Sequence, residues 1–296
     1  MRKRIKQILA GALCFGLAIS DKSALSLGEI NMDKVTVQAA ENVSDITIDG
    51  NNINKENKNG LTYKGFGLLT ANSTSDLLMD YKAEHPEKYV EMLQYLFGGS
   101  KPLMTHVKIE MGNDRNNSTG AESCTMRTED ETANVKRNAG FQLAADAKKI
   151  NPNIKISILR WNTPKWANAT EKQYKWYKNT IMAAYETYGY MVDYINPNRN
   201  EAWSDKTDTE NVKKFAKWIQ EENSDTIKDA KALDLYKKIK FIVSDEAEMI
   251  AKTAVNALYT DEEYKNAVAA IGWHYPYSVA SKSRDGADIL TKDDII

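Results

Sequence analysis

The stretch NPNIKISILRWNTPKW, residues 151–166, shows most directly how this chain is built. Its β-branched run, Ile154–Leu159, predicts a short buried strand that ends in a polar, aromatic, proline-containing loop. The preceding segment, Asn134–Ile150, has apolar residues at helical spacing, and Pro152 helps to end that helix. A helix, a strand and a loop rich in chemistry-bearing side chains therefore follow one another.

The same alternation continues in both directions from this stretch. Beside the strand at 154–159 we expect strands at Gly65–Leu69, His106–Met111, Met191–Ile195, Ile239–Val243 and Ala269–His274. Beside the helix at 134–150 we expect helices at Glu87–Phe97, Glu171–Tyr188, Thr209–Glu222 and Glu246–Leu258. In the first of these, Val90, Leu93, Leu96 and Phe97 are expected on one side. Repeated strand–helix units predict an α/β fold with a parallel sheet.

Two parallel architectures fit this alternation, a doubly wound sheet and a (β/α)8 barrel. The first strand is followed by no G-x-G-x-x-G loop, because the sequence there reads GFGLLTANS. Polar and aromatic residues gather after the strand ends, where barrel enzymes assemble their sites. We therefore predict a (β/α)8 TIM-barrel type, truncated after about six β/α units and leaving open sheet edges.

The N-terminal region differs from the rest of the chain. A basic leader, Met1–Lys6, precedes the apolar run Ile8–Ile19, which is too short for a comfortable membrane span. We expect a signal peptide over residues 1–20, a linker with a short strand near Ile46–Ile48 over residues 21–60, and an incomplete barrel catalytic domain over residues 61–296. The mature protein is expected to be secreted or at the cell surface, with no membrane span.

Composition argues against several other classes of protein. Lysine and arginine total 40 against 41 aspartate and glutamate, so no overall field favours nucleic acid. The 3 histidines are scattered without metal-ligand spacing, and we expect neither a metal nor a cofactor. Cys14 lies in the expected signal peptide and would be lost with it, which leaves Cys124 without an internal disulfide partner.

The most informative motif is the pair Asn200–Glu201, which follows the expected fourth strand. Glycoside hydrolysis needs a carboxylic acid that protonates the leaving oxygen, and a neighbouring amide can hydrogen-bond a sugar hydroxyl. An Asn-Glu pair is common in proteins, so its place after the fourth strand carries the argument.

Three further loops carry candidate substrate-binding residues. Trp161 and Trp166 follow the third strand, where they could stack on sugar faces or simply pack at the barrel rim. Ser118 lies in the polar loop at 112–120, which could also be merely solvated. His274 and Tyr275 end the sixth strand, although a lone histidine there is more often structural.

Taken together, these segments resemble glycoside hydrolase family 59, the galactocerebrosidase family. The resemblance runs from about Tyr63 to Tyr277 and rests on the Asn-Glu pair and five segments in order: KGFGLLTANSTSDLLMDY, HVKIEMGNDRNNSTGAES, NPNIKISILRWNTPKWA, IKFIVSD and IGWHYP. The W-x-x-P-x-W and Asn-Glu elements are shared by the wider barrel clan. The loop containing GND and the HYP element point more narrowly to this family.

The resemblance implies a retaining hydrolase that removes terminal β-galactosyl groups from a glycan or glycolipid. Glu201 matches the family's acid/base and Asn200 its substrate-binding neighbour. Trp161 matches a tryptophan lining the galactose pocket, and Ser118 stands where the family usually has a sugar-binding threonine. We also expect Trp166, His274 and Tyr275 among the substrate-binding residues.

One departure from the family pattern bears on activity. The family's nucleophile is a glutamate after the seventh strand, whereas here the sequence after the HYP element reads YSVASKSRDGADILTKDDII. Its carboxylate side chains are Asp285, Asp288, Asp293 and Asp294, and none has a matching context. We therefore expect the nucleophile to be absent and this polypeptide to be inactive as given.

Two other functions stay open on the sequence. Another barrel-clan β-glycosidase would share the Asn-Glu pair and the tryptophan loop, and a non-catalytic carbohydrate-binding protein could keep the pocket without the nucleophile. Asp245 and Glu246 follow the fifth strand and resemble a catalytic pair, but we prefer a helix N-terminal cap formed by Ser244 or Asp245.

Overall fold

A computed structural model describes residues 63–117, 120–200, 206–246 and 248–273. The expected signal peptide and the linker with its short strand lie outside the described residues. The strands form a 6-stranded parallel sheet in the order β1-β2-β3-β4-β5-β6. Their bounds are β1 Phe66–Thr70, β2 Met104–Glu110, β3 Lys155–Arg160, β4 Tyr194–Arg199, β5 Lys240–Glu246 and β6 Val268–Trp273.

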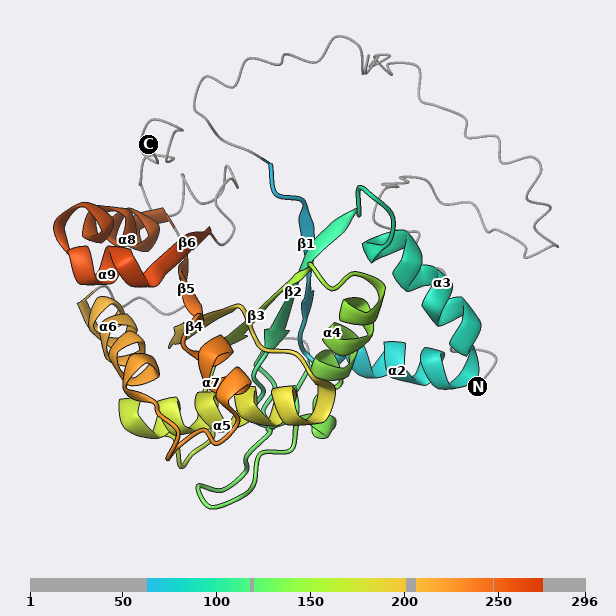
Figure 1. Ribbon diagram of the computed structural model, residues 1–296, viewed down its shortest axis with the longest axis horizontal. Coiled ribbons are helices and arrows are strands. Elements are labelled where there is room, and N and C mark those ends of the chain that lie inside the picture. Colours follow the sequence, from blue (N-terminus) through green and yellow to red (C-terminus); the bar gives the residue numbers. More distant parts are fainter. Residues whose placement is uncertain (1–62, 118–119, 201–205, 247, 274–296) are drawn as a thin grey trace, which may run out of the picture. The chain divides into compact units, whose positions relative to one another are not determined.

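Helices connect successive strands and lie in an arc outside the sheet (Figure 1). Their bounds are α2 Thr74–Glu84, α3 Pro86–Phe97, α4 Ala139–Ile150, α5 Thr170–Tyr188, α6 Lys206–Glu221, α7 Ala230–Tyr236, α8 Glu248–Thr260 and α9 Glu262–Ala267. A short 3-10 turn, η1 (Val135–Arg137), precedes α4. The expected helix at 134–150 is therefore divided at Asn138, whose side chain caps α4 by accepting from Gly140 N.

The strand order confirms the barrel type of fold. Each strand pairs with the strand next to it in sequence, and every pairing is parallel. A doubly wound sheet would reverse its strand order at a switch point, and no reversal occurs among these strands. The described residues thus contain six strands in barrel order and the helices that connect them.

The sheet is curled rather than flat, as an ion pair across its concave face shows. Lys108 on β2 bonds the carboxylate of Asp245 on β5, although β3 and β4 lie between these strands. In a flat sheet the two strands would be roughly 14 Å apart, with their side chains parallel. Curvature toward a barrel makes such side chains converge.

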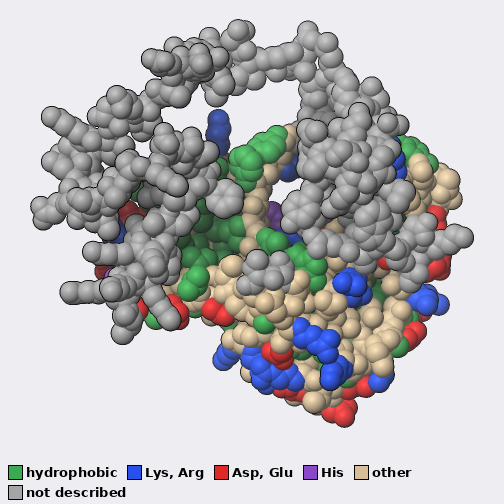
Figure 2. Space-filling model, turned by 180° about the vertical axis from the view of Figure 1, so that it is seen from behind, with side chains coloured by type: hydrophobic (Ala, Val, Ile, Leu, Met, Phe, Trp, Pro, Cys, Tyr) green, Lys and Arg blue, Asp and Glu red, His purple; other side chains and the backbone are tan. Residues whose placement is uncertain are grey.

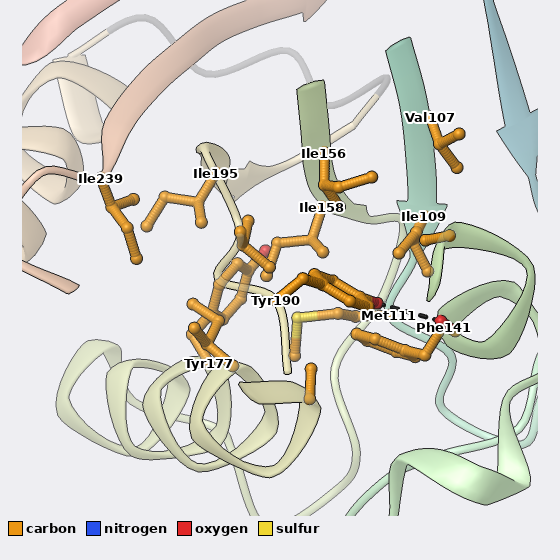
Figure 3. Packing of buried hydrophobic residues seen from close by; sticks show 14 of the residues in the cluster. Val107, Ile109, Met111, Phe141, Ile156, Ile158, Tyr177, Tyr190, Ile195 and Ile239 are labelled. Carbon is orange, nitrogen blue, oxygen red and sulfur yellow. Dashed lines mark hydrogen bonds between the residues drawn. The ribbon is translucent and has the colours of Figure 1, made fainter. Parts of the chain in front are cut away.

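The hydrophobic core lies between the convex face of the sheet and the helices. Val107 and Ile109 of β2 and Ile156 and Ile158 of β3 point toward α4 and α5 (Figure 3). Within this core the Tyr190 hydroxyl donates to the Phe141 carbonyl oxygen at 3.1 Å, so a buried polar group is satisfied.

Helix α3 shows where helical spacing alone misjudged a buried face. Its buried residues are Tyr89, Leu93 and Phe97, while Val90 is 48% exposed. The three buried positions are four residues apart and form one row on the helix, whereas Val90 lies about 100° around the axis from Tyr89. The predicted inclusion of Val90 in the buried face was therefore wrong.

The edge strands leave apolar side chains exposed within the described part of the chain. Phe66 and Leu69 of β1 are 59% and 44% exposed, and Tyr63 packs its ring edge-on against Phe66. Elsewhere the face seen in Figure 2 carries mixed charge, with basic side chains beside acidic ones. Among the helices described, none has the length and apolar composition needed to cross a membrane.

Candidate active site

The carboxyl ends of β2 to β5 bring polar side chains together from distant parts of the sequence. The backbone N–H of Asn200, the residue after β4, donates to the carbonyl of Arg160 at the end of β3, with an N···O distance of 2.8 Å. This bond continues the strand pairing and fixes where the chain leaves β4. Asn200 is 1% exposed, so its side-chain amide must find partners inside the protein.

Asn200 is held between Trp161 and Asp245. Its amide is assigned with the oxygen toward Trp161, because this orientation satisfies both neighbours. The oxygen accepts from the indole Nε1 at 3.1 Å, and the nitrogen donates to Asp245 Oδ2 at 2.7 Å and to the Asp245 carbonyl at 2.9 Å. Asp245 in turn bonds Lys108, so four strands contribute to one network.

The backbone at the end of β5 takes an unusual shape where it joins this network. Ser244 and Asp245 both have positive φ, 67° and 61°. Non-glycine residues in this left-handed region are strained and persist where surrounding contacts fix them. The Asp245 carboxylate bonds Lys108 and Asn200, and the buried Ser244 hydroxyl has no hydrogen-bond partner among the described residues. Of the two residues expected to cap the next helix, Ser244 is therefore not the cap, and the Asp245 side chain bonds Lys108 and Asn200.

Two buried carboxyl groups, Glu110 at the end of β2 and Glu122 in the loop that follows, bond the turn after β1. Glu110 is fully buried; its Oε2 accepts from Asn72 N at 2.9 Å and its Oε1 from Asn117 Nδ2 at 2.8 Å. Glu122 is 1% exposed and accepts from Ser73 N at 2.9 Å. Burial raises the pKa of Glu110, while its two hydrogen bonds oppose the shift.

Burial also raises the pKa of Glu122, to about 7. The Ser73 N–H works against this shift, and the negative charges of Glu110 and Asp76 add to it. Near neutral pH the Glu122 carboxyl group therefore keeps a substantial protonated fraction.

The structure unites some of the predicted site residues and separates others. Trp161 and Asn200 are hydrogen-bonded, as a shared pocket requires. Trp166 packs against the core and donates its indole N–H to the Met126 carbonyl at 2.9 Å, which is how a structural tryptophan behaves. Glu201, Ser118, His274 and Tyr275 lie outside the described residues.

Sequence reasoning missed Lys108, Glu110 and Glu122 as members of the site. A signal for the first two exists in the second strand, where His106, Lys108 and Glu110 alternate with apolar residues. Because side chains on a strand alternate between faces, the polar set faces the barrel interior and the apolar set faces the helices. His106, two residues before Lys108 on the same face of β2, bonds Ser157 of β3, with 2.7 Å between Nε2 and Oγ.

Other kinds of site find little support in the part of the chain that the structure describes. No group of three or more His, Cys, Asp or Glu residues there is placed to hold a metal ion. Cys124 is free and buried, and its thiol donates to the Met126 carbonyl. Burial raises the pKa of this thiol to about 11, which disfavours the reactive thiolate.

Comparison with known proteins assigns this chain to a family. The sequence profile of glycosyl hydrolase family 59 matches residues 63–294. The chain belongs to glycosyl hydrolase family 59.

Named relatives of this family 59 chain are animal galactocerebrosidases. The protein of Danio rerio is 29% identical over 228 residues, which cover 73% of this chain and 31% of that protein. The protein of Mus musculus is 27% identical over 253 residues, covering 79% and 33%. The chain thus spans about a third of the length of these relatives.

A solved structure supports the fold independently. The endo-β1,6-glucanase BT3312 superposes with a TM-score of 0.52 at 16% sequence identity, over 72% of this chain and 52% of that one. At this identity the likeness concerns the fold alone.

Removing Lys108 should destabilise the protein through the charge that it leaves behind. Lys108→Met removes the lysine that bonds the Asp245 carboxylate, whose side chain is 7% exposed. Because Lys108 itself is 28% exposed, we expect a loss on the order of 2 kcal/mol in the free energy of unfolding, below the full cost of a broken buried pair. Denaturant titration measures it. The double variant Lys108→Met/Asp245→Asn should regain most of the loss; equal stability of the single and double variants would contradict a charge effect.

Because the pKa of Glu122 is raised in the folded state, the free energy of unfolding should fall as the pH rises and this carboxyl group loses its proton. Its folded-state pKa, about 7, exceeds the ordinary value of 4.5, so the folded state holds a proton that the unfolded state releases. The resulting stability is present below about pH 4.5 and is lost as pH rises to about 7, by an amount on the order of 2–3 kcal/mol. Glu122→Gln should flatten this part of the pH–stability curve. Glu222→Gln, whose carboxyl pKa is lowered, is the control that should leave it unchanged.

Proposed function

We propose that the protein carries the galactose-binding and proton-donating part of a retaining glycoside hydrolase of galactosylceramidase type, which removes terminal β-galactosyl groups. The observation that carries the proposal is the fixed amide of Asn200, held between Trp161 and Asp245 at the carboxyl end of β4. Membership of family 59 supports the reaction class, and the galactocerebrosidase relatives support the sugar.

In this proposal Glu201, the residue after Asn200, protonates the departing glycosidic oxygen. The Asn200 amide oxygen accepts from a galactose hydroxyl with the lone pair that the Trp161 indole does not use. The Trp161 ring lines the apolar side of the sugar, and the Ser118 hydroxyl adds a further polar contact. An amide held by two partners need not reorganise as charge develops, which is how a preorganised site lowers a barrier.

A retaining reaction also needs a nucleophilic carboxylate about 5–5.5 Å from the acid/base. Asp245 reaches the site, but its carboxylate is engaged by Lys108 and Asn200. We propose that Asp245 serves as a structural anchor and that the nucleophile is not among the residues of this chain. Retaining hydrolysis of the kind proposed would then need a carboxylate from outside this sequence.

We further propose that the protein is exported and meets its galactoside outside the cell, as a glycan or a glycolipid. The basic leader and apolar run at the N-terminus support export. His274 and Tyr275 belong to the family-like HYP element, and we propose that they line the same pocket.

Ligand binding tests the sugar specificity without requiring turnover. A galactose-configured iminosugar should bind the chain at least about tenfold more tightly than its glucose-configured epimer, because a site built to hydrogen-bond one hydroxyl penalises its misplacement. Isothermal titration measures both affinities. Trp161→Ala should weaken binding without a collapse in stability. Equal affinity for the two epimers would favour another β-glycosidase of the barrel clan, and a collapse of Trp161→Ala would favour a packing role.

Hydrolysis tests the assigned roles. The chain of 296 residues should not turn over an aryl β-D-galactoside, while a version extended by any coding sequence that follows should do so. In an active form, Glu201→Gln should slow cleavage of unactivated galactosides by about 10²-fold or more, because Gln cannot donate the proton. Activated aryl galactosides should suffer much less. Turnover by the 296-residue chain would show that the nucleophile lies within it.

A further inference from the structure

Glu110 makes one contact to each of two loops, and a third loop joins through a shared side chain. Its Oε2 accepts from Asn72 N in the turn between β1 and α2, and its Oε1 accepts from Asn117 in the loop after β2. Asn117 passes the connection on, since its Oδ1 accepts from Asn162 Nδ2 at 2.7 Å in the loop after β3. Asn162 directly follows Trp161.

The turn held by Glu110 is one that the backbone does not adopt readily by itself. Asn72 and Ser73 both have positive φ, 54° and 60°. Their successive N–H groups donate to Glu110 and Glu122, one to each carboxyl group. These two hydrogen bonds to buried carboxyl groups offset the strain of consecutive left-handed residues.

The loop after β2 lies tightly against this turn. A Cβ atom on Gly120 would come within 2.2 Å of the Asn72 carbonyl oxygen, so glycine is required there. The Ser73 hydroxyl bonds the Ala121 carbonyl, and Asn117 N donates to the Gly120 carbonyl at 3.3 Å. Residues 118–119 lie between these anchors in sequence, and 118 is the serine assigned to the sugar.

We propose that Glu110 is a positioning residue of the galactose pocket, whose two carboxylate oxygens hold the turn after β1 and, through Asn117, the loop that carries Trp161. The inference rests on the proposed function for the identity of the sugar, but its structural part stands apart from it. Both partners of the Glu110 carboxylate are N–H donors, so the site requires an acceptor at each oxygen. A glutamine offers one oxygen and one NH₂ group and cannot satisfy both donors.

The proposal can be tested by exchanging the carboxylate and the amide between positions 110 and 117. Glu110→Gln should break one bond or force the Asn117 amide to turn, which then sets its NH₂ group against that of Asn162. Asn117→Asp alone should place two carboxylates in contact. In the double variant Glu110→Gln/Asn117→Asp, the new amide donates to the new carboxylate, which still accepts from Asn162. The double variant keeps the charge of the wild type and restores every bond.

Hydrogen–deuterium exchange of the full chain, read by mass spectrometry, tests the structural part. Glu110→Gln should speed exchange by roughly tenfold in peptides covering 112–124 and 161–163, since the loss of a buried hydrogen bond to a charged group loosens both loops. The double variant should return toward the wild-type rates. Glu222→Gln, a matched change at a buried carboxyl group that bonds Tyr174 and Lys178, should leave these peptides unchanged.

A milder variant covers the case in which Glu110→Gln does not fold. Asn162→Ala removes the last bond of the series while Glu110 keeps both of its partners. It should loosen residues 161–163 and leave the exchange of Asn72 unchanged. Wild-type exchange at 161–163 in this variant, or in Glu110→Gln, would overturn the proposal.

Binding of the galactose-configured iminosugar, measured by titration on the same variants, separates this inference from the proposed function. Roughly tenfold weaker binding by Glu110→Gln, with recovery in the double variant, supports both. Loosened loops in a chain whose wild type binds no iminosugar would uphold the positioning role and overturn the galactose assignment. Unaltered binding by Glu110→Gln in a wild type that binds would overturn the link to the pocket.

Discussion

The contact between Lys108 and Asp245 is the constraint on which the rest of the site depends. It spans the concave face from β2 to β5 and therefore requires the sheet to curl. A buried carboxylate is costly unless it is paired, so the lysine stabilises Asp245 where it can also receive the Asn200 amide. Through Asn200 the same contact reaches Trp161 on the neighbouring loop. Curvature, charge compensation and the orientation of the candidate sugar-binding groups are thus parts of one arrangement.

The two faces of the sheet carry different kinds of side chain. On the convex side, β-branched residues pack against α4 and α5 and form an apolar core (Figure 3). On the concave side the second strand places His106, Lys108 and Glu110 in succession toward the carboxyl end of the barrel. Polar groups there are satisfied by partners on other strands and loops, which makes the site rigid because each side chain has a fixed role. Rigid scaffolds of this kind allow loops to carry the chemistry.

Family membership and the geometry support each other at different levels. The match over residues 63–294 assigns the chain to family 59, and the amide held after β4 is what a barrel glycosidase needs beside its acid. Because the chain covers about a third of its galactocerebrosidase relatives, the activity of the whole protein stays a proposal. Trp166 belongs to the same W-x-x-P-x-W element as Trp161, and it packs against the core and donates its indole N–H to the Met126 carbonyl.

The sequence by itself determined the order of strands and helices, because hydrophobic periodicity and strand-ending loops are local properties. It also determined the place of Asn200–Glu201 after the fourth strand, and of Trp161 after the third. Only the tertiary structure decided that Asp245 receives the Asn200 amide, that Glu110 bonds two loops and reaches a third through a shared side chain, and that Val90 is 48% exposed. These facts depend on which side chains meet across a curved sheet, and residues 108 and 245 are brought together by that curvature alone.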